Sequence, residues 1–234
     1  MADFDAAWQL ADPIPGWLTR DQGRALWDAV RRLPAGARVV EIGSHQGRST
    51  VVLAAAAARG RDVRVTAIDP FVEGRLFGGP TTRAKFEANL ARAGLGAAVD
   101  LVVGYSTRLR PRWRDPIDLL YIDGKHDYWT FTDDLRWSRH LRPGGEILVH
   151  DCFSSIGVTS GLLAKVLPSS GYVYLDRTGS LARFRRGRPA FEDRLRIVRE
   201  LPWFARNVGI KVLLRLRLRP VARRFGHTSV YDPY

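Results

Sequence analysis

The 234-residue chain has a single cysteine, Cys152, so it cannot form an internal disulfide. A chain of this length is stabilised by its apolar core, and we expect one domain with at most a short appendage. The first residues also lack the charged region, the apolar run and the small-residue cleavage site of a secretory signal. We therefore expect a cytoplasmic protein.

Long apolar runs are missing as well. The longest, Val51 to Ala58, is far shorter than the roughly 18 to 20 residues that cross a bilayer, which excludes a transmembrane helix. Acidic residues are scarce in one region: residues 183–234 contain 14 Lys and Arg against 4 Asp and Glu, in a chain whose net charge is +13. Most of the excess positive charge therefore lies in the C-terminal tail, and the body of the chain is nearly neutral.

Short apolar runs rich in β-branched residues alternate with helical stretches as far as residue 150. The expected strands are residues 38–42, 63–68, 101–103, 117–122 and 147–149, and the expected helices are residues 48–59, 82–93, 128–140 and 161–167. Strict alternation predicts a doubly wound, mostly parallel α/β sheet. Residues 172–175 and 181–185 flank a turn sequence and are expected to close the sheet as an antiparallel hairpin. Residues 71–82 have the composition of a loop, either a lid or a plain surface loop.

Both ends of the chain are expected to add helices to this sheet. Thr19 and Gln22 form a capping-box pattern before a helix, and we assign residues 1–35 to an N-terminal helical cap. Residues 187–234 form a basic, amphipathic extension, in which residues 191–201 are helical and Pro202 breaks them. Residues 208–225 show both strand-like and helical periodicity, and we prefer a helix.

A glycine-containing turn follows the first expected strand. The segment from Glu41 to Gly47 would let a nucleotide-like ligand approach the backbone at the carboxyl edge of the sheet. His45 stands where dinucleotide enzymes need their second glycine, which disfavours NAD and FAD. Asp69 ends the second strand and suits ribose hydroxyls, or else caps a turn. Ser106, after the third strand, either reaches an adenine edge or is an ordinary turn serine.

The order of these motifs resembles the class I S-adenosylmethionine-dependent methyltransferases, and within them the bacterial small-molecule O-methyltransferase-like group with an Ile-Asp-Gly-x-His motif. The resemblance covers roughly residues 16–186 and rests on four stretches, Val39–Thr50, Ala67–Asp69, Asp118–His126 and Leu141–Gly145. It implies a seven-stranded Rossmann-like sheet with a final antiparallel strand and a cofactor domain over residues 1–186. It also implies that Glu41, Gly43 and Gly47 surround the methionine moiety of S-adenosylmethionine and that Asp69 binds its ribose. The predicted cofactor residues further include Ser44, Ser106 and Asp123.

Polar side chains also follow the fourth and fifth strands. Asp123, His150 and Asp151 converge at the carboxyl edge, where oxygen and nitrogen ligands suit Mg²⁺ or another divalent cation. The catechol- and caffeoyl-type O-methyltransferases, which this half of the chain resembles more distantly, place an acid after strand four and an acidic or amide pair after strand five. That resemblance implies a metal site at these three residues, although histidine in the middle position departs from the pattern.

The spacing from Asp123 to His126 matches that from metal ligand to general base in those relatives, which implies that His126 is the base. An imidazole with a pKa near ~6.5 can accept a proton at neutral pH. Two alternatives stay open: His126 is a surface residue that opens the next helix, or His150 is the base and no metal binds.

We therefore expect a methyltransferase that transfers a methyl group to a hydroxyl of a small molecule, sugar or glycolipid. The alternatives are a nicotinamide-dependent oxidoreductase and a non-catalytic, membrane-associated cofactor-binding protein. The tail either binds an anionic surface on the inner face of the membrane or packs on the protein. Nucleic acid is disfavoured because the body lacks a basic stripe with interleaved aromatics. A homodimer is left open.

Overall fold

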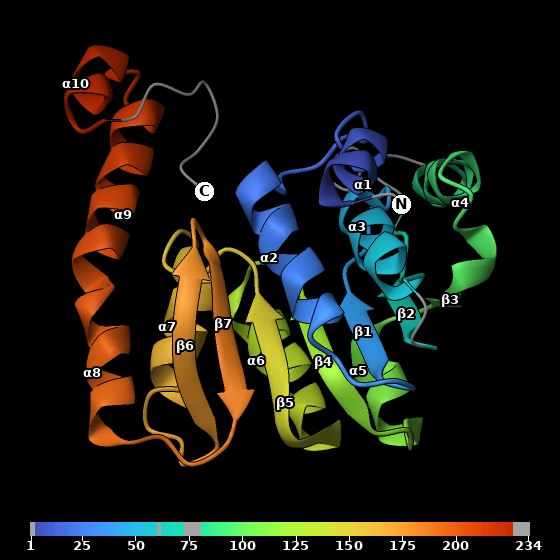
Figure 1. Cartoon of the computed structure of the whole chain (residues 1–234). Helices are drawn as coiled ribbons and strands as arrows, with labels where there is room; N and C mark the ends of the chain where they lie inside the picture. Colours follow the sequence, from blue (N-terminus) through green and yellow to red (C-terminus); the bar gives the residue numbers. More distant parts are fainter. Residues whose placement is uncertain (1–2, 60–61, 73–80, 227–234) are drawn as a thin grey trace.

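A seven-stranded sheet forms the centre of the structure, a computed structural model that describes residues 3–59, 62–72 and 81–226 (Figure 1). The strand order is β3-β2-β1-β4-β5-β7-β6; β1 to β5 pair in parallel, and β7 is antiparallel to both neighbours. The strands are β1 Arg38–Ile42, β2 Arg64–Asp69, β3 Val99–Val103, β4 Ile117–Ile122, β5 Leu141–Val149, β6 Tyr172–Thr178 and β7 Leu181–Arg186. The expected doubly wound sheet with a final antiparallel strand is confirmed.

The two faces of the sheet carry separate apolar cores, because successive strand residues point to opposite sides. Val39 of β1 belongs to the core that includes residues of α1 Phe4–Ala11, α2 Arg20–Arg31, α3 Arg48–Ala57 and α4 Thr82–Arg92. Its neighbour Val40 belongs to the core that includes residues of α6 Tyr128–Leu135, α7 Ile156–Lys165 and α8 Phe191–Arg199. The remaining short helices are α5 Ser106–Leu109 and the 3₁₀ turns η2 Gly96–Ala98, η3 Arg110–Arg112 and η4 Arg136–His140.

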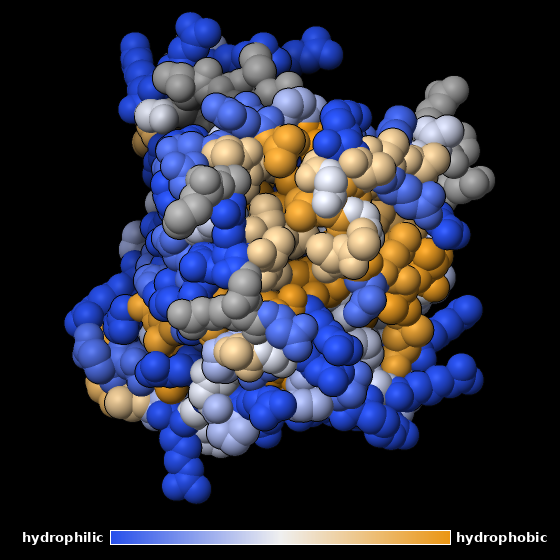
Figure 2. Space-filling view, turned by 45° about the vertical axis from the view of Figure 1, so that its right-hand side comes forward, coloured by the Kyte–Doolittle hydropathy of each residue, from blue (hydrophilic) through white to orange (hydrophobic). Residues whose placement is uncertain are grey.

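The N-terminal helices cover the β1 side of the first face. The capping box at the start of α2 is present as expected, with Thr19 and Gln22 bonding each other's backbone amides. Helix α1, which the sequence pattern does not resolve, is capped by Asp3 and buries Phe4 and Trp8. Figure 2 views this side and shows apolar residues from the middle of the face to its right-hand edge, with hydrophilic residues above, below and to the left.

Several expected boundaries were wrong. Helix α7 begins at Ile156, five residues before the expected start, because Ser155 caps it through the amide of Val158. The stretch expected as one helix over 128–140 tightens into the 3₁₀ turn η4 after Leu135. Most of the loop expected over 71–82 lies outside the described residues.

The C-terminal extension is helical but not as one piece. Helix α8 runs beside the edge strand β6, and α9 Leu201–Arg215 continues beyond it (Figure 1). The expected break at Pro202 is present: α8 ends at Arg199, and Pro202 sits in the first turn of α9, where its missing N–H costs no intrahelical bond. The helix expected over 208–225 ends at Arg215 and resumes as α10 Arg219–Arg224, after a turn in which Arg217 has φ 60°. Among the described residues, no helix combines the length and the apolar character needed to cross a membrane.

Candidate functional site

The turn after β1 packs directly against the end of β4. Gly43 has φ 89°, and a Cβ added to it would lie 2.3 Å from the carbonyl oxygen of Asp123. Its amide donates to Ile68 at the end of β2 over 2.9 Å. Only glycine fits here, because the backbone is left-handed and the neighbouring chain leaves no room. Gly47, also left-handed with φ 90°, is the N-cap of α3.

Asp69 organises this turn from the end of β2. Its Oδ2 accepts the amides of Ser44 and His45, both at 2.9 Å, and its Oδ1 accepts the amide of Phe71 at 2.6 Å. His45 has φ 47°, so the position that holds glycine in dinucleotide enzymes keeps the left-handed backbone here despite its side chain. The structure thus gives Asp69 a turn-forming role at the edge where the sequence analysis places the ribose.

Glu41 lies fully buried beneath the same turn. The hydroxyls of Ser49 and Thr50, in the first turn of α3, both donate to its carboxylate. Burial raises the pKa of Glu41 to about 7, although these hydroxyls oppose the shift. The predicted cofactor residues Glu41, Gly43, Ser44, Gly47 and Asp69 therefore belong to one connected turn between β1, β2 and α3.

Ser106 is held by a partner that the sequence analysis missed. It begins α5, is buried, and donates its hydroxyl to Asp134 of α6. Burial raises the pKa of Asp134 to about 7, against the lowering effect of Ser106. A Cβ on Gly124 would come within 2.9 Å of the Asp134 carboxylate, so this pair lies next to the loop after β4. The contact engages the hydroxyl that was expected to face adenine.

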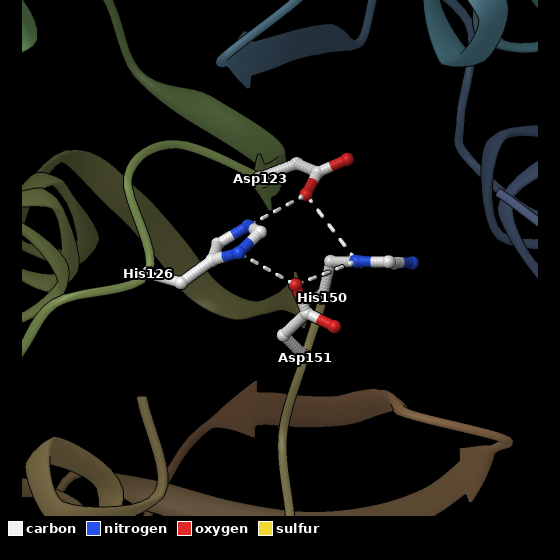
Figure 3. Close-up of side chains that lie close together, drawn as sticks. All are labelled: Asp123, His126, His150 and Asp151. Atoms are coloured by element: carbon white, nitrogen blue, oxygen red, sulfur yellow. Dashed lines mark ion pairs between the residues drawn. The ribbon is translucent and has the colours of Figure 1, made fainter. Parts of the chain in front are cut away.

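Four polar side chains from the ends of β4 and β5 face one another around a common centre (Figure 3). His126 spans two carboxylates, with Nδ1 at 2.9 Å from Asp151 Oδ2 and Nε2 at 3.5 Å from Asp123 Oδ1. His150 presents Nδ1 to the same two oxygens at 3.4 and 3.3 Å. One ligand atom from each of the four residues lies within 4.8 Å of the other three. The three predicted metal ligands and the predicted base are therefore together.

Other contacts fix the orientation of the two carboxylates. The Tyr121 hydroxyl donates to Asp123 Oδ2 over 2.8 Å, which turns Oδ1 toward the histidines. Ser154 donates to Asp151 Oδ1 over 3.1 Å, and Asp151 itself has φ 59° in a tight loop. The sequence did carry a signal for Tyr121, because residues two apart on a strand point to the same side.

The electrostatics of the cluster favour two charged histidines facing two charged carboxylates. Burial lowers the pKa of each histidine, but Asp123 and Asp151 outweigh it and raise the pKa of His126 to about 10 and that of His150 to about 9. Burial raises the pKa of Asp151, but the two histidines bring it well below its usual value. Without a metal ion the four side chains therefore sum to zero charge near neutral pH.

The donor set also fits a divalent cation. Within the described residues, His150 Nδ1 and Asp151 Oδ2 are buried atoms that make no hydrogen bond of good geometry, and both point into the centre of the cluster. Two imidazoles and two carboxylates are ligands that first-row divalent metals accept, with carboxylates suiting Mg²⁺ and Mn²⁺ and imidazoles the later metals. An ion in the centre would replace the two protons without changing the net charge.

Residues 40–152, which contain both the turn and the cluster, match a family model described as a methyltransferase domain. This match assigns a methyltransferase domain to a little under half of the chain. The expected family is confirmed, and the comparison supports an enzyme. The N-terminal helices, the β6–β7 hairpin and α8 to α10 lie outside the matched residues.

Solved structures similar to this methyltransferase show the same fold. Cofactor-bound Rv0187 from MTB is 24% identical with a TM-score of 0.61, over 80% of this chain and 89% of that one. The O-methyltransferase TomG from Streptomyces achromogenes, involved in tomaymycin synthesis and solved with SAM, is 20% identical with a TM-score of 0.58, over 80% and 91%. An O-methyltransferase from Bacillus cereus in complex with SAH is 18% identical with a TM-score of 0.56, over 80% and 92%.

Proposed function

We propose that this methyltransferase uses S-adenosylmethionine to methylate a hydroxyl group of a small molecule, sugar or glycolipid, with the help of a divalent cation. One observation carries the proposal: His126 lies between two carboxylates that could hold a cation, beside a left-handed glycine turn of the kind that receives a nucleoside. The solved neighbours that carry SAM or SAH support the choice of cofactor.

The cofactor would lie against the turn after β1. Gly43 and Gly47 allow the tight left-handed turn, in which their missing side chains make room for the Asp123 backbone and the Phe86 ring. Asp69 offers a half-buried carboxylate to the ribose while it holds the amides of Ser44 and His45. Glu41 would face the methionine moiety from below. Ser106 and Asp123 remain proposed cofactor contacts, and Ser106 would then have to share its hydroxyl with Asp134.

Asp123, His150 and Asp151 would hold the cation, with His126 facing it. When bound, the cation would orient the acceptor hydroxyl and lower its pKa. The carboxylates keep protons on both histidines while no cation is present, and a charged imidazole cannot act as a base. Replacing those protons would leave His126 neutral and able to accept one.

In the reaction, His126 would take the proton from the acceptor oxygen as that oxygen bonds to the methyl carbon. The bond from carbon to sulfur breaks in line, and S-adenosylhomocysteine leaves as a neutral thioether. The sulfonium methyl is already activated, so the residues around it act mainly by positioning the reactants. His126 suits the role because 43% of its side chain is exposed, whereas His150 is enclosed and better placed as a ligand.

Calorimetric titration with S-adenosylhomocysteine and with NAD tests the cofactor. We expect binding of S-adenosylhomocysteine alone, because the His45 side chain occupies the position where a pyrophosphate needs glycine. Binding of NAD alone would favour the oxidoreductase alternative. Binding of S-adenosylhomocysteine without turnover on any hydroxyl acceptor, with or without Mn²⁺, would favour a non-catalytic cofactor-binding protein.

We also propose that the end of the C-terminal extension binds an anionic membrane surface, where a glycolipid acceptor would be found. Residues 201–226 contain no Asp or Glu and seven cations, namely Arg206, Lys211, Arg215, Arg217, Arg219, Arg223 and Arg224. The same segment exposes the apolar side chains of Leu216, Leu218 and Phe225. Each cation near such a surface contributes about 1 kcal/mol, and the apolar side chains would enter the headgroup region.

Flotation with vesicles containing phosphatidylserine tests this surface. We expect the triple variant L216Q/L218Q/F225Q to lose flotation, whereas the control F191Q, which changes an exposed apolar residue of α8, should keep it. Equal flotation of both variants would refute membrane binding through this segment.

A further inference from the structure

A fully buried glutamine from α2 reaches the cluster of Asp123, His126, His150 and Asp151 from outside the residues that match the methyltransferase model. Gln22 makes three side-chain contacts: its Oε1 accepts the amide of Thr19 over 2.9 Å, the same oxygen lies 3.2 Å from His150 Nε2, and its Nε2 donates to Ser180 Oγ over 3.1 Å. Ser180, in the β6–β7 turn, is also fully buried. Helix α2, β5 and the hairpin thus meet at one side chain.

These contacts determine which way the amide of Gln22 faces. The amide of Thr19 can only donate, so the atom opposite it must be the oxygen of Gln22, and the nitrogen must face Ser180. Since that oxygen can only accept, the contact with His150 is a hydrogen bond only when Nε2 of His150 carries a proton. The side chain that completes the capping box of α2 therefore also determines that Nε2 of His150 carries a proton.

The role of the other ring nitrogen, Nδ1, follows from this. With Nε2–H bound to Gln22, Nδ1 is the nitrogen that faces Asp123 Oδ1 and Asp151 Oδ2. A histidine that binds a metal through one nitrogen usually donates its other N–H to a fixed acceptor, which sets the tautomer and the ring orientation. We propose that Gln22 is the positioning residue that keeps the proton on Nε2 of His150 and so presents Nδ1 to the cation of the proposed function.

Three variants separate this role from the capping of α2. Gln22→Met keeps the length of the side chain but cannot accept a hydrogen bond. Gln22→Glu restores an acceptor for both Thr19 and His150, because Glu is the other usual residue at this capping-box position. Thr19→Ala removes the opposite half of the capping box and leaves the contact with His150 in place. Circular dichroism and thermal unfolding report how far each variant destabilises the fold.

The first measurement needs no metal. In protein labelled with ¹⁵N at histidine, we expect one Nε2–H signal that exchanges slowly with water and disappears in His150→Asn. The slow exchange should persist in Thr19→Ala and Gln22→Glu, whereas in folded Gln22→Met the Nε2–H has no acceptor and its signal should be lost to fast exchange. Its absence from the wild type, or its persistence in Gln22→Met, would overturn the proposal. If Gln22→Met does not fold, the wild type and Gln22→Glu decide, since loss of the signal in folded Gln22→Glu would overturn it equally.

The second measurement is the affinity for Mn²⁺ by calorimetry. Loss of a partner behind a metal ligand typically weakens metal binding about 10- to 100-fold, and we expect this for Gln22→Met. Thr19→Ala should bind Mn²⁺ like the wild type, and Gln22→Glu should bind it at least as tightly, because its added carboxylate lies behind His150. An equal loss in Gln22→Met and Thr19→Ala would mean that Gln22 acts only through the helix. A wild type that binds no divalent metal would refute the proposed metal site, while the protected Nε2–H signal would still decide the role of Gln22.

Discussion

Binding of a divalent cation to the cluster should release close to two protons. The pKa of His126 is about 10 and that of His150 about 9, so both rings carry a second proton at pH 7.5. Both owe these values to Asp123 and Asp151, the carboxylates that a cation would neutralise. When the cation takes over the carboxylates, neither imidazole keeps the field that held its extra proton.

The pH dependence of metal affinity follows from this proton count. Release of two protons makes the association constant rise about 100-fold for each pH unit, because each proton contributes a factor of ten, or about 1.4 kcal/mol. The sign is that of a site in which protons compete with the metal: affinity increases with pH and levels off as the pH passes the range of about 9 to 10, where the histidines lose their protons without a cation.

Calorimetric titration of the metal-free protein with Mn²⁺ at pH 7.5 measures the number of protons directly, when it is repeated in buffers of different ionisation enthalpy. His126→Gln should lower the count from two to about one, and the slope of log affinity against pH should fall equally. A count near zero in the wild type, or an affinity that does not change between pH 6.5 and 8, would refute the assignment of two protonated histidines facing two carboxylates.

Three further predictions test the chemistry and its support. His126→Gln should reduce turnover about 10²- to 10⁴-fold in a methyl-transfer assay and leave affinity for S-adenosylhomocysteine unchanged; full turnover would exclude it as the base. Gly43→Ala should lower the free energy of unfolding by at least about 1–3 kcal/mol in urea titrations, since its Cβ would meet the Asp123 carbonyl; unchanged stability would contradict the left-handed turn. Asn207→Leu should cost about 1–3 kcal/mol and weaken Mn²⁺ binding, because the buried Asn207 amide donates to the Phe153 carbonyl in the Asp151 loop; unaltered Mn²⁺ affinity would exclude that support.

The sheet could be predicted from sequence because its signals are local. The apolar runs of β1 and β4 are buried on both faces of the sheet, so they are recognised as continuous strands. Gly43 and Gly47 mark the turn that follows β1. Helix boundaries were less accurate where one side chain decides them. Ser155 starts α7 early, and the turn around Arg217 divides the last helix, although neither position interrupts the apolar periodicity.

The cluster could be predicted because the carboxyl ends of neighbouring parallel strands meet, which brings Asp123 and His150 together whatever the details of the loops. The residues that orient the cluster could not. Gln22 lies 128 positions from His150, and Asn207 lies 54 positions from Phe153. Both are amides on helices that the local pattern only marks as amphipathic, so their roles depend on how the ends of the chain pack.

Position 150 holds a histidine, whereas the metal pattern described for the catechol- and caffeoyl-type enzymes has an acid or an amide there. Electrostatics explain why a histidine suits this fold. A third carboxylate would face Asp123, Asp151 and the oxygen of Gln22 in a pocket that leaves 1% of the His150 side chain exposed. Buried like charges without a partner are costly, whereas a protonated imidazole balances them. We therefore expect His150→Asp to melt at a lower temperature than the wild type in EDTA, and its preference for Mn²⁺ over Mg²⁺ to decrease because oxygen ligands suit Mg²⁺. Differential scanning calorimetry with and without each metal measures both effects, and a variant as stable as the wild type in EDTA would contradict the argument from buried charge.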